Sequence, residues 1–285
     1  MTDRSNIIAF QGETGANSDI ACRTVRPGME TLPCTSFEDT FAAVRDGKAA
    51  FAMIPIDNSV AGRVADIHHL LPESDLFIIG EHFQRVEHHL LAVKGAKLEE
   101  LTHVHSHVHA LNQCRNFIQD HGISPIVHVD TAAAARDIAE RREKQHAAIA
   151  TDLAGEIYGL ESLAANIEDA EHNTTRFLLM APEPAEVSPG DGELMTSFIF
   201  RVRNVPAALY KSLGGFATNG VNMTKLESYL VGGGFVAAQF YAEVDGHPDD
   251  TGLKFALEEL EFFSHEVRIL GTYPAHPFRK SMNGS

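Results

Sequence analysis

One short segment of the chain carries side chains suited to binding a small carboxylate. Residues 173–177 read NTTRF, and Arg176 is the only Lys or Arg between Lys144 and Arg201. A guanidinium binds a carboxylate through two parallel hydrogen bonds, and the neighbouring amide and hydroxyl groups can add more. The segment is therefore a candidate active site, although an exposed Arg on a strand edge would give the same pattern.

Two other segments place polar side chains after predicted strands. Residues 10–18, FQGETGANS, lead into a helix whose free N–H groups favour an anion, with Ser18 as the predicted helix cap. Residues 54–62, IPIDNSVAG, follow a buried strand and present Asp57, Asn58 and Ser59 where strand ends commonly carry ligands. A simple turn needs only Asp57, so the three polar residues together favour contacts to a substrate.

An alternating run of histidines resembles a metal site. His103, His105, His107 and His109 would share one face of a strand, because side chains alternate between its two faces. No carboxylate stands at matching spacing within residues 103–110, HVHSHVHA, and an ordinary solvated strand edge has the same alternation. We therefore predict no metal site.

Composition narrows the class of protein. The chain of 285 residues has a formal net charge of −16, which argues against a nucleic acid or an anionic membrane as a partner. Its three cysteines form no CxxC pair and are expected to be reduced thiols in the cytoplasm. The first residues lack the apolar core of a signal peptide, and no segment approaches the ~20 apolar residues that span a bilayer.

The first two-thirds of the chain alternates short apolar runs with helical stretches, which predicts an α/β fold with a mostly parallel sheet. Strands are predicted at residues 7–10, 49–54, 76–79, 90–93, 126–129, 147–150 and 177–180. Helices are predicted at residues 36–45, 110–120, 131–142 and 153–158.

A change of composition marks a second domain. Residues 181–193, APEPAEVSPGDGE, hold three prolines, two glycines and four acidic residues in thirteen positions, which is typical of a linker. We place the first domain at residues 1–183, the linker at 184–193, the second domain at 194–275 and a disordered tail at 276–285. The second domain is predicted to run strand 194–202, helix 206–219, strands 222–231 and 234–244, helix 249–263 and strand 266–273. This βαββαβ order is typical of a ferredoxin-like unit.

Taken together, these segments resemble prephenate dehydratase followed by an ACT regulatory domain, from residue 8 to residue 274. The NTTRF segment matches the family's NxTRF signature, and IPIDNS matches its IPIENS segment with Asp57 in place of Glu. Ser106, His107 and residues 110–114 match its SHPQAL-x-QC stretch, and residues 130–134, DTAAA, match a strand-to-helix segment. The resemblance implies a two-lobed fold of the type II periplasmic-binding-protein kind. The chain would cross between the lobes near residues 79–82 and 169–174, with Thr175 at the cleft.

The resemblance also implies a reaction. Prephenate would lose carbon dioxide and water together to give phenylpyruvate, with no cofactor and no metal. Thr175 would assist departure of the ring hydroxyl as a hydrogen-bond donor, and Arg176, Asn58 and Ser59 would complete the catalytic set. The expected substrate-binding residues are Asn17, Ser18, Asp57, Asn173, Thr174, Phe177 and Gln113.

The second domain resembles an ACT domain through residues 220–228, GVNMTKLES, which match the core GVNLTKIES. Two departures from the family are that GALV reads AALY at residues 207–210 and ESRP reads ESYL at residues 227–230. Phenylalanine is the expected effector, and a homodimer or homotetramer is the expected assembly. The expected effector site comprises Ala208, Leu209, Gly220, Val221, Asn222, Leu226, Glu227 and Ser228.

Two alternatives remain open at this point. Arogenate dehydratases share these motifs, and the sequence does not separate an amino group from a keto group on the substrate. A non-catalytic protein that binds a small anion or an amino acid would use the same two-lobed cleft, but it would not explain the attached second domain.

Overall fold

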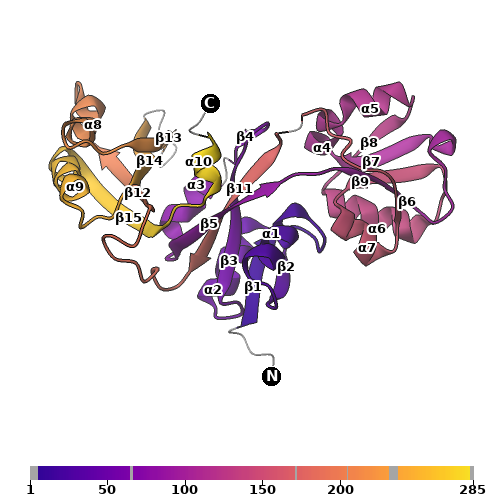
Figure 1. Ribbon diagram of the computed structural model, residues 1–285, viewed down its shortest axis with the longest axis horizontal. Coiled ribbons are helices and arrows are strands. Elements are labelled where there is room, and N and C mark those ends of the chain that lie inside the picture. The colour runs from indigo at the N-terminus through magenta and orange to yellow at the C-terminus, as the bar shows by residue number, and fades with distance from the viewer. Residues whose placement is uncertain (1–5, 65–66, 171, 204, 231–236, 283–285) are drawn as a thin grey trace. The chain divides into compact units, whose positions relative to one another are not determined.

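Strands and helices alternate through the first two-thirds of the chain, as the apolar pattern predicts. The computed structural model describes residues 6–64, 67–170, 172–203, 205–230 and 237–282 (Figure 1). The chain packs as two compact units that are each discontinuous in sequence. Unit 1 combines Met1–Val64 with His82–Phe177, and unit 2 combines Ala65–Glu81 with Leu178–Ser285. Unit 1 contains the second lobe and most of the first lobe, whose residues 67–81 and 178–181 fall in unit 2.

The first lobe is built on a sheet with the strand order β2-β1-β3-β11-β5, and the short β4 pairs with β3. Strand β1 is parallel to both of its neighbours, and its residues Ile8, Ala9 and Phe10 are fully buried. Such a continuous apolar run is what a strand covered on both faces requires. The strands are β1 (Ile7–Gln11), β2 (Glu30–Cys34), β3 (Phe51–Asn58), β4 (Gly62–Arg63), β5 (Phe77–Arg85) and β11 (Thr174–Ala181); the helices are α1 (Asn17–Val25), α2 (Phe37–Arg45) and α3 (Ile67–Leu70).

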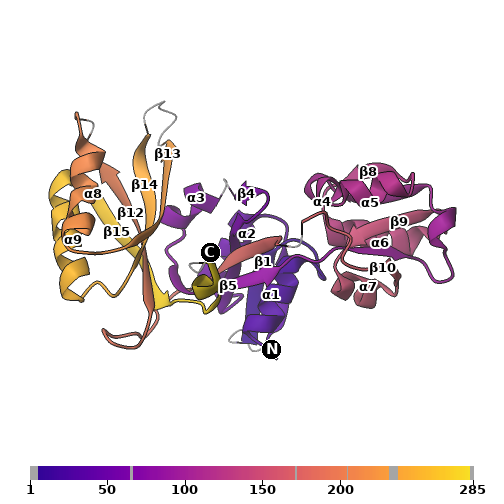
Figure 2. The ribbon, with the colours of Figure 1, turned by 45° about the horizontal axis from the view of Figure 1, so that its top comes forward.

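The second lobe has a sheet with the order β10-β6-β9-β7-β8 and helices on both of its faces (Figures 1 and 2). In β9, Ala147 and Ile149 pack in the same cluster as α4 and α5, whereas Ala148 and Ala150 pack with α6 and α7. Alternate residues of one strand therefore serve two separate cores. The elements are β6 (His89–Ala92), β7 (His103–His107), α4 (Val108–Gln113), α5 (Arg115–Asp120), β8 (Ser124–His128), α6 (Thr131–Arg141), β9 (His146–Ala150), α7 (Asp152–Tyr158) and β10 (Glu161–Ala164).

The last third of the chain forms the predicted βαββαβ order, with an antiparallel sheet β13-β14-β12-β15. Helices α8 and α9 lie side by side against one face of this sheet (Figure 1), and Gly215 of α8 lies against Glu259 of α9. A Cβ at Gly215 would lie 2.9 Å from Cβ of Glu259, so close packing explains this glycine. The elements are β12 (Leu194–Val202), α8 (Ala208–Thr218), β13 (Met223–Leu230), β14 (Ala237–Asp245), α9 (Thr251–Phe263) and β15 (Ser264–Pro274).

Several predicted boundaries are wrong for local reasons. Ala16, not Ser18, is the N-cap of α1, and the Asp19 carboxylate instead accepts the Gly15 N–H at 2.8 Å. The predicted helix 110–120 is divided at Cys114, whose φ of −116° and ψ of 25° leave the helical region. Strands β2, β7 and β10 were not among the predicted strands. Residues 231 and 234–236 of the predicted strands lie outside the described residues.

Two further predictions concern cysteines and membranes. All three cysteines are free, and Cys22 and Cys114 are buried. Burial raises the pKa of both of these thiols, so they stay protonated at neutral pH. Within the described part of the chain, no helix is both long enough and apolar enough to cross a membrane.

The tail after β15 is ordered, contrary to the prediction, up to the last described residue, 282. It forms α10 (Phe278–Met282), and the Arg279 guanidinium contacts two carboxylates of unit 2 that are almost fully buried. Arg279 Nε lies 2.6 Å from Glu81 Oε1, and Arg279 Nη2 lies 3.0 Å from Glu243 Oε2. The backbone N–H of His276 also donates to Glu81 at 2.9 Å. The sequence gives no sign of this docking, because the three charges are far apart in the chain.

Replacing Arg279 by Ala should destabilise unit 2, because the change removes the cation that both buried carboxylates face. Removing one partner of a buried ion pair costs about 3–5 kcal/mol. Lys280→Ala is the matched control, since Lys280 is exposed and its ion pair with Glu193 is worth less than about 1 kcal/mol. Urea unfolding followed by circular dichroism would measure both. Equal midpoints for the two variants would contradict the assignment.

Candidate active site

Asn58, Asn173 and Thr175 meet where the end of β3 lies beside the start of β11. The Asn58 side-chain Nδ2 donates to Asn173 Oδ1 at 2.8 Å and to Thr175 Oγ1 at 3.0 Å. These residues come from the two motifs that the sequence analysis selected, 115 and 117 positions apart. The structure therefore joins both motifs in a single polar cluster.

The orientation of the Asn58 amide is fixed from its other side. Its Oδ1 accepts the backbone N–H groups of Val60 at 3.0 Å and Ala61 at 2.7 Å, so Nδ2 must face Thr175. Because Thr175 Oγ1 accepts a hydrogen bond from Asn58, its own proton is left to donate to another group. This geometry makes the Thr175 hydroxyl a directed donor.

Asn173 offers a second donor at the same place. The residue is 1 % exposed, and its Nδ2 has no acceptor among the described residues. A buried amide donor without an acceptor costs about 1–3 kcal/mol, so such a group is well placed to bind an oxygen atom of a ligand. Asn173 Nδ2 and the Thr175 hydroxyl are thus two donors that lie two positions apart in the chain.

Ser59 holds the backbone of the two motifs together. Its Oγ donates to the carbonyl of His172 at 2.7 Å and accepts the N–H of Thr174 at 2.9 Å. The Ser59 N–H also donates to the Thr174 carbonyl at 2.9 Å. The hydroxyl is therefore engaged with the protein backbone, and the structure brings it to the site as a support.

Arg176 lies on the opposite side of β11 from Thr175, as the alternation of side chains along a strand requires. It is buried, with Nη1 3.7 Å from Asp57 Oδ2 and its guanidinium 5.8 Å from the ring centre of Phe83. The exposed strand-edge Arg that the sequence left open is not found. Phe177 is also buried, in the core, and Thr174 is half-buried.

The first turn of α1 lies at the same edge of the sheet as Asn58. Strands β1 and β3 are parallel neighbours, so their carboxyl ends, which lead to α1 and to Asn58, point the same way. Asn17 and Ser18 are the first two residues of α1 and are half-buried. Their backbone N–H groups belong to the helix end that favours an anion.

Gln113 lies at the connection between the lobes. Its Oε1 is 2.8 Å from Nε2 of His88, and its carbonyl accepts the Asp169 N–H at 2.6 Å. Strand β5 is longer than the predicted strand 76–79, so the first connection runs through residues 86–88, after the predicted 79–82. The two connections bond to each other, since Val86 N–H donates to the Asn173 carbonyl at 2.8 Å.

His88 sits in this connection as a neutral side chain. Its Nδ1 is buried without a partner among the described residues, and the Gln113 contact engages only Nε2. Burial lowers the pKa of His88, because a charged imidazole would be removed from water. The residue was not singled out by the sequence analysis, since a lone buried histidine carries no local pattern.

The alternating histidines form β7 and pack against another histidine. The ring of His103 stacks on His146 at 4.9 Å, and His105 Nε2 lies 2.9 Å from His146 Nδ1. Burial, together with the nearby positive charges of Arg141, His146, His103 and His128, lowers the pKa of His105 to about 4. No group of three or more His, Cys, Asp or Glu in the described part of the chain is arranged to hold a metal ion.

The structure also brings together four residues that the sequence analysis did not connect. Glu13 and Thr14 follow β1 in the first lobe, whereas Arg136 and Tyr158 lie on α6 and α7 of the second. Arg136 donates to Glu13 at 2.8 Å, and Tyr158 donates to the carbonyl of Thr14 at 3.0 Å. Pairs separated by 123 and 144 positions leave no signal in a single sequence.

The chain is similar in sequence and structure to known proteins over most of its length. The family model described as prephenate dehydratase matches residues 8–185. A bifunctional N-acyl-homoserine lactone acylase/prephenate dehydratase from Komagataeibacter europaeus is 54% identical over 274 residues, which cover 96% of this chain and 98% of that protein. The chloroplastic arogenate dehydratase/prephenate dehydratase 2 of Arabidopsis thaliana is 37% identical over 94% of this chain and 72% of that protein.

A solved structure shows the same similarity in three dimensions. The prephenate dehydratase of Arthrobacter aurescens in complex with L-Phe has a TM-score of 0.85 and 30% sequence identity, covering 94% of this chain and 90% of that one. The two-lobed fold of the type II periplasmic-binding-protein kind is thereby confirmed.

Folding stability should fall as the pH drops from about 6.5 to about 4, in part because of His105. The folded protein holds this histidine neutral down to a pKa of about 4, whereas the unfolded chain binds its proton near pH 6.5. The stabilisation is therefore complete above pH 6.5 and lost on acidification. His105→Gln should flatten this part of the curve, and replacing the exposed His109 by Gln should not. Urea unfolding at several pH values would measure the slopes; parallel curves for wild type and H105Q would contradict the assignment.

Proposed function

The chain belongs to the prephenate dehydratase family, and on that basis we propose that the Asn58–Thr175 cluster removes carbon dioxide and water from prephenate to give phenylpyruvate. The enzyme is accordingly a carbon–oxygen lyase, in the biosynthesis of phenylalanine. The motifs at residues 54–59 and 173–177 support this proposal, because they form a single hydrogen-bonded cluster.

The reaction needs only orientation and assistance to a leaving group. When the bond from the ring to its carboxylate breaks, the electron pair enters the ring and expels the hydroxide on the opposite carbon. Carbon dioxide leaves, the ring becomes aromatic, and the hydroxide needs a proton or a hydrogen bond. The Thr175 hydroxyl is a poor acid at neutral pH, so its role is to stabilise the departing oxygen as a donor.

The remaining polar groups would hold the two carboxylates of prephenate. The N–H groups at the start of α1, near Asn17 and Ser18, suit one carboxylate, and Asn173 Nδ2 suits an oxygen close to Thr175. Arg176 is assigned a supporting role, because it is buried beside Asp57. Asp57 and Arg176 would keep the end of β3 in place, and Ser59 would fix the backbone next to it.

The observation that carries the proposal is the direction of the Thr175 hydroxyl, set by Asn58. The direct test is to incubate the purified protein with prephenate and, separately, with arogenate, and to follow phenylpyruvate and phenylalanine. We propose prephenate as the preferred substrate. Formation of phenylalanine from arogenate, with no phenylpyruvate from prephenate, would instead identify an arogenate dehydratase.

Thr175→Ala should lower kcat by on the order of 10²-fold, because the departing oxygen loses its donor. Thr175→Ser keeps the hydroxyl and should retain much more activity. Asn58→Asp replaces the Nδ2 donor with an acceptor, so it should also lower kcat although Thr175 is unchanged. Steady-state kinetics with prephenate would measure all three variants. An Ala variant with near-normal turnover would rule out the role of Thr175.

We further propose that the βαββαβ unit is an ACT domain that binds phenylalanine and inhibits the enzyme. Leu226 is partly exposed on the edge strand β13, and large apolar side chains are exposed on α8 and α9. Such a surface suits pairing with a second copy, as a homodimer or homotetramer. The proposed effector site comprises Ala208, Leu209, Gly220, Val221, Asn222, Leu226, Glu227 and Ser228.

Asn222→Ala should weaken inhibition by phenylalanine and leave turnover without phenylalanine unchanged. In the structure Asn222 Nδ2 donates to Asp245 Oδ2 at 2.8 Å, so the amide is held at the proposed site by a neighbouring strand. A coupling between the two sites of about 1–3 kcal/mol would suffice for inhibition. Inhibition curves for wild type and N222A measure the effect. Calorimetry that detects no phenylalanine binding at millimolar ligand would contradict the regulatory proposal alone.

A second candidate activity is hydrolysis of N-acyl-homoserine lactones. It is favoured by the 54% identity, over 96% of this chain, to a protein described as a bifunctional acylase and prephenate dehydratase. Release of homoserine lactone from an N-acyl-homoserine lactone would test it directly. If T175A loses prephenate turnover but keeps this release, the two activities use different groups.

We place the protein in the cytoplasm. The supporting observation is that all three cysteines are free thiols, which is the usual state of cysteine in a reducing compartment. Fractionation of the source cells would test the location.

A further inference from the structure

Three consecutive residues of one loop in the first lobe contact the second lobe. Glu13 forms an ion pair with Arg136, with Oε2 and Nη1 2.8 Å apart, and the carbonyl of Thr14 accepts a hydrogen bond of 3.0 Å from Tyr158. The carbonyl of Gly15 accepts a hydrogen bond from the hydroxyl of Thr151. The loop is thus held by side chains from α6, from α7 and from the residue that caps α7.

The contact at Gly15 leaves no room for a side chain. Gly15 has a φ of +91°, and a Cβ there would lie 2.9 Å from Cα of Ala154. Thr151 is almost fully buried and is the N-cap of α7, so its hydroxyl also accepts the Ala154 N–H at 3.1 Å. The backbones of the two lobes therefore meet directly at this point.

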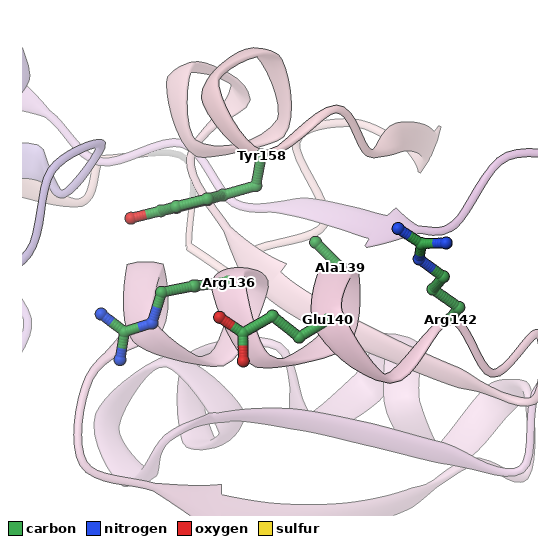
Figure 3. Close-up of a pocket in the computed structure, with 5 residues that line it drawn as sticks. All are labelled: Arg136, Ala139, Glu140, Arg142 and Tyr158. Carbon is green, nitrogen blue, oxygen red and sulfur yellow. The ribbon is translucent and has the colours of Figure 1, made fainter.

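Arg136 and Tyr158 reach the loop from the rim of one pocket. Figure 3 shows the Tyr158 ring above Arg136, with the hydroxyl and the guanidinium directed to the same side. Glu140 extends from the same helix as Arg136, and Arg142 lies at the other end of the pocket. Arg136 and Arg142 thus share a pocket but differ in that only Arg136 contacts Glu13.

The loop leads directly into the first turn of α1. Ala16 is the N-cap and Asn17 the first helical residue, so the position of Glu13, Thr14 and Gly15 sets where the helix start lies. The N–H groups of that turn are those assigned above to a substrate carboxylate. Any group that holds the loop against the second lobe therefore also brings these N–H groups to the cleft.

We propose that Arg136 and Tyr158 are positioning residues that hold the two lobes closed on the substrate by fixing residues 13–15 at the start of α1. The proposal rests on the dehydratase function assigned above. A two-lobed protein is held closed by contacts that exist only in its closed form. Such contacts raise the fraction of molecules in the closed form, which is the form that binds substrate.

The contact between Arg136 and Glu13 is an ion pair that is partly exposed to water. The side chains of Arg136 and Glu13 are 39% and 40% exposed, so water weakens the attraction between them. Burial raises the pKa of Tyr158, so its hydroxyl remains a donor over the working pH range.

The test compares two arginines of the same pocket. Arg136→Leu should raise KM for prephenate by roughly two- to fivefold with kcat little changed, which is the shift expected from losing one exposed ion pair. Arg142→Leu removes the same charge from the same pocket but no contact to Glu13, and its KM should match wild type. Tyr158→Phe, which lacks only the hydroxyl, should raise KM about twofold.

Exchanging the charges of Glu13 and Arg136 tests whether the rise in KM comes from the lost contact or only from the lost positive charge. In the double variant Glu13→Arg with Arg136→Glu, the pair is restored with reversed sign and unchanged net charge, so KM should return to within about twofold of wild type. The proposal is overturned if R136L and R142L have the same KM, or if the exchange leaves KM at the level of the single variants.

A measurement without substrate keeps this proposal separate from the proposed function. Hydrogen exchange of the amides in residues 13–17 should be faster in R136L than in R142L and should recover in the exchanged pair. If the wild type turns over no prephenate but the exchange rates differ as expected, the contact stands and the dehydratase assignment falls. Equal exchange rates in R136L and R142L would overturn the positioning role itself.

Discussion

The hydrogen bonds of one amide side chain fix the polar cluster at the end of β3 and the start of β11. Asn58 accepts two backbone N–H groups with its oxygen and donates to Asn173 and Thr175 with its nitrogen. Rotating the Asn58 amide by half a turn would break all four hydrogen bonds, so the positions of its donor and its acceptor are fixed. Because its oxygen accepts the Asn58 hydrogen bond, Thr175 keeps its own proton for donation to another group. Aspartate or leucine in place of Asn58 would keep the fold but would lose the amide donor to Thr175.

The cluster requires the chain to leave the first sheet and come back. Strand β3 ends at Asn58, and β11 begins at Thr174, after the whole second lobe has been built. The two connections between the lobes are tied by the hydrogen bond from Val86 to Asn173, so a residue of the site also belongs to the hinge.

The sequence predicts those features that depend on local pattern. Apolar runs predicted most of the strands. The helix predicted from Ser36 is α2, and the Ser36 side chain caps it by accepting the Asp39 N–H. The motifs at residues 54–59 and 173–177 do meet in one hydrogen-bonded cluster, but residue type alone did not predict which of their side chains face that cluster. Arg176 was expected to bind an anion, but its side chain is buried beside Asp57. Which way the Arg176 side chain faces depends on which side of β11 is covered by the rest of the fold. The docked tail and the pair of Glu13 with Arg136 could not be predicted, since both depend on contacts between residues more than a hundred positions apart.

Each of the two units is formed from two separate segments of the chain, and this affects folding during synthesis. Unit 1 is complete once Phe177 has been synthesised, whereas residues 65–81 belong to a unit whose other part begins at Leu178. Glu81 is made 198 residues before its partner Arg279. At about 5–20 residues per second, a ribosome needs roughly 10–40 s to cover that distance. During this time the early segment of unit 2 is without the partners that residues 178–285 will supply. Translation speed after residue 178, and any chaperone that covers the waiting segment, should therefore influence the yield of folded protein.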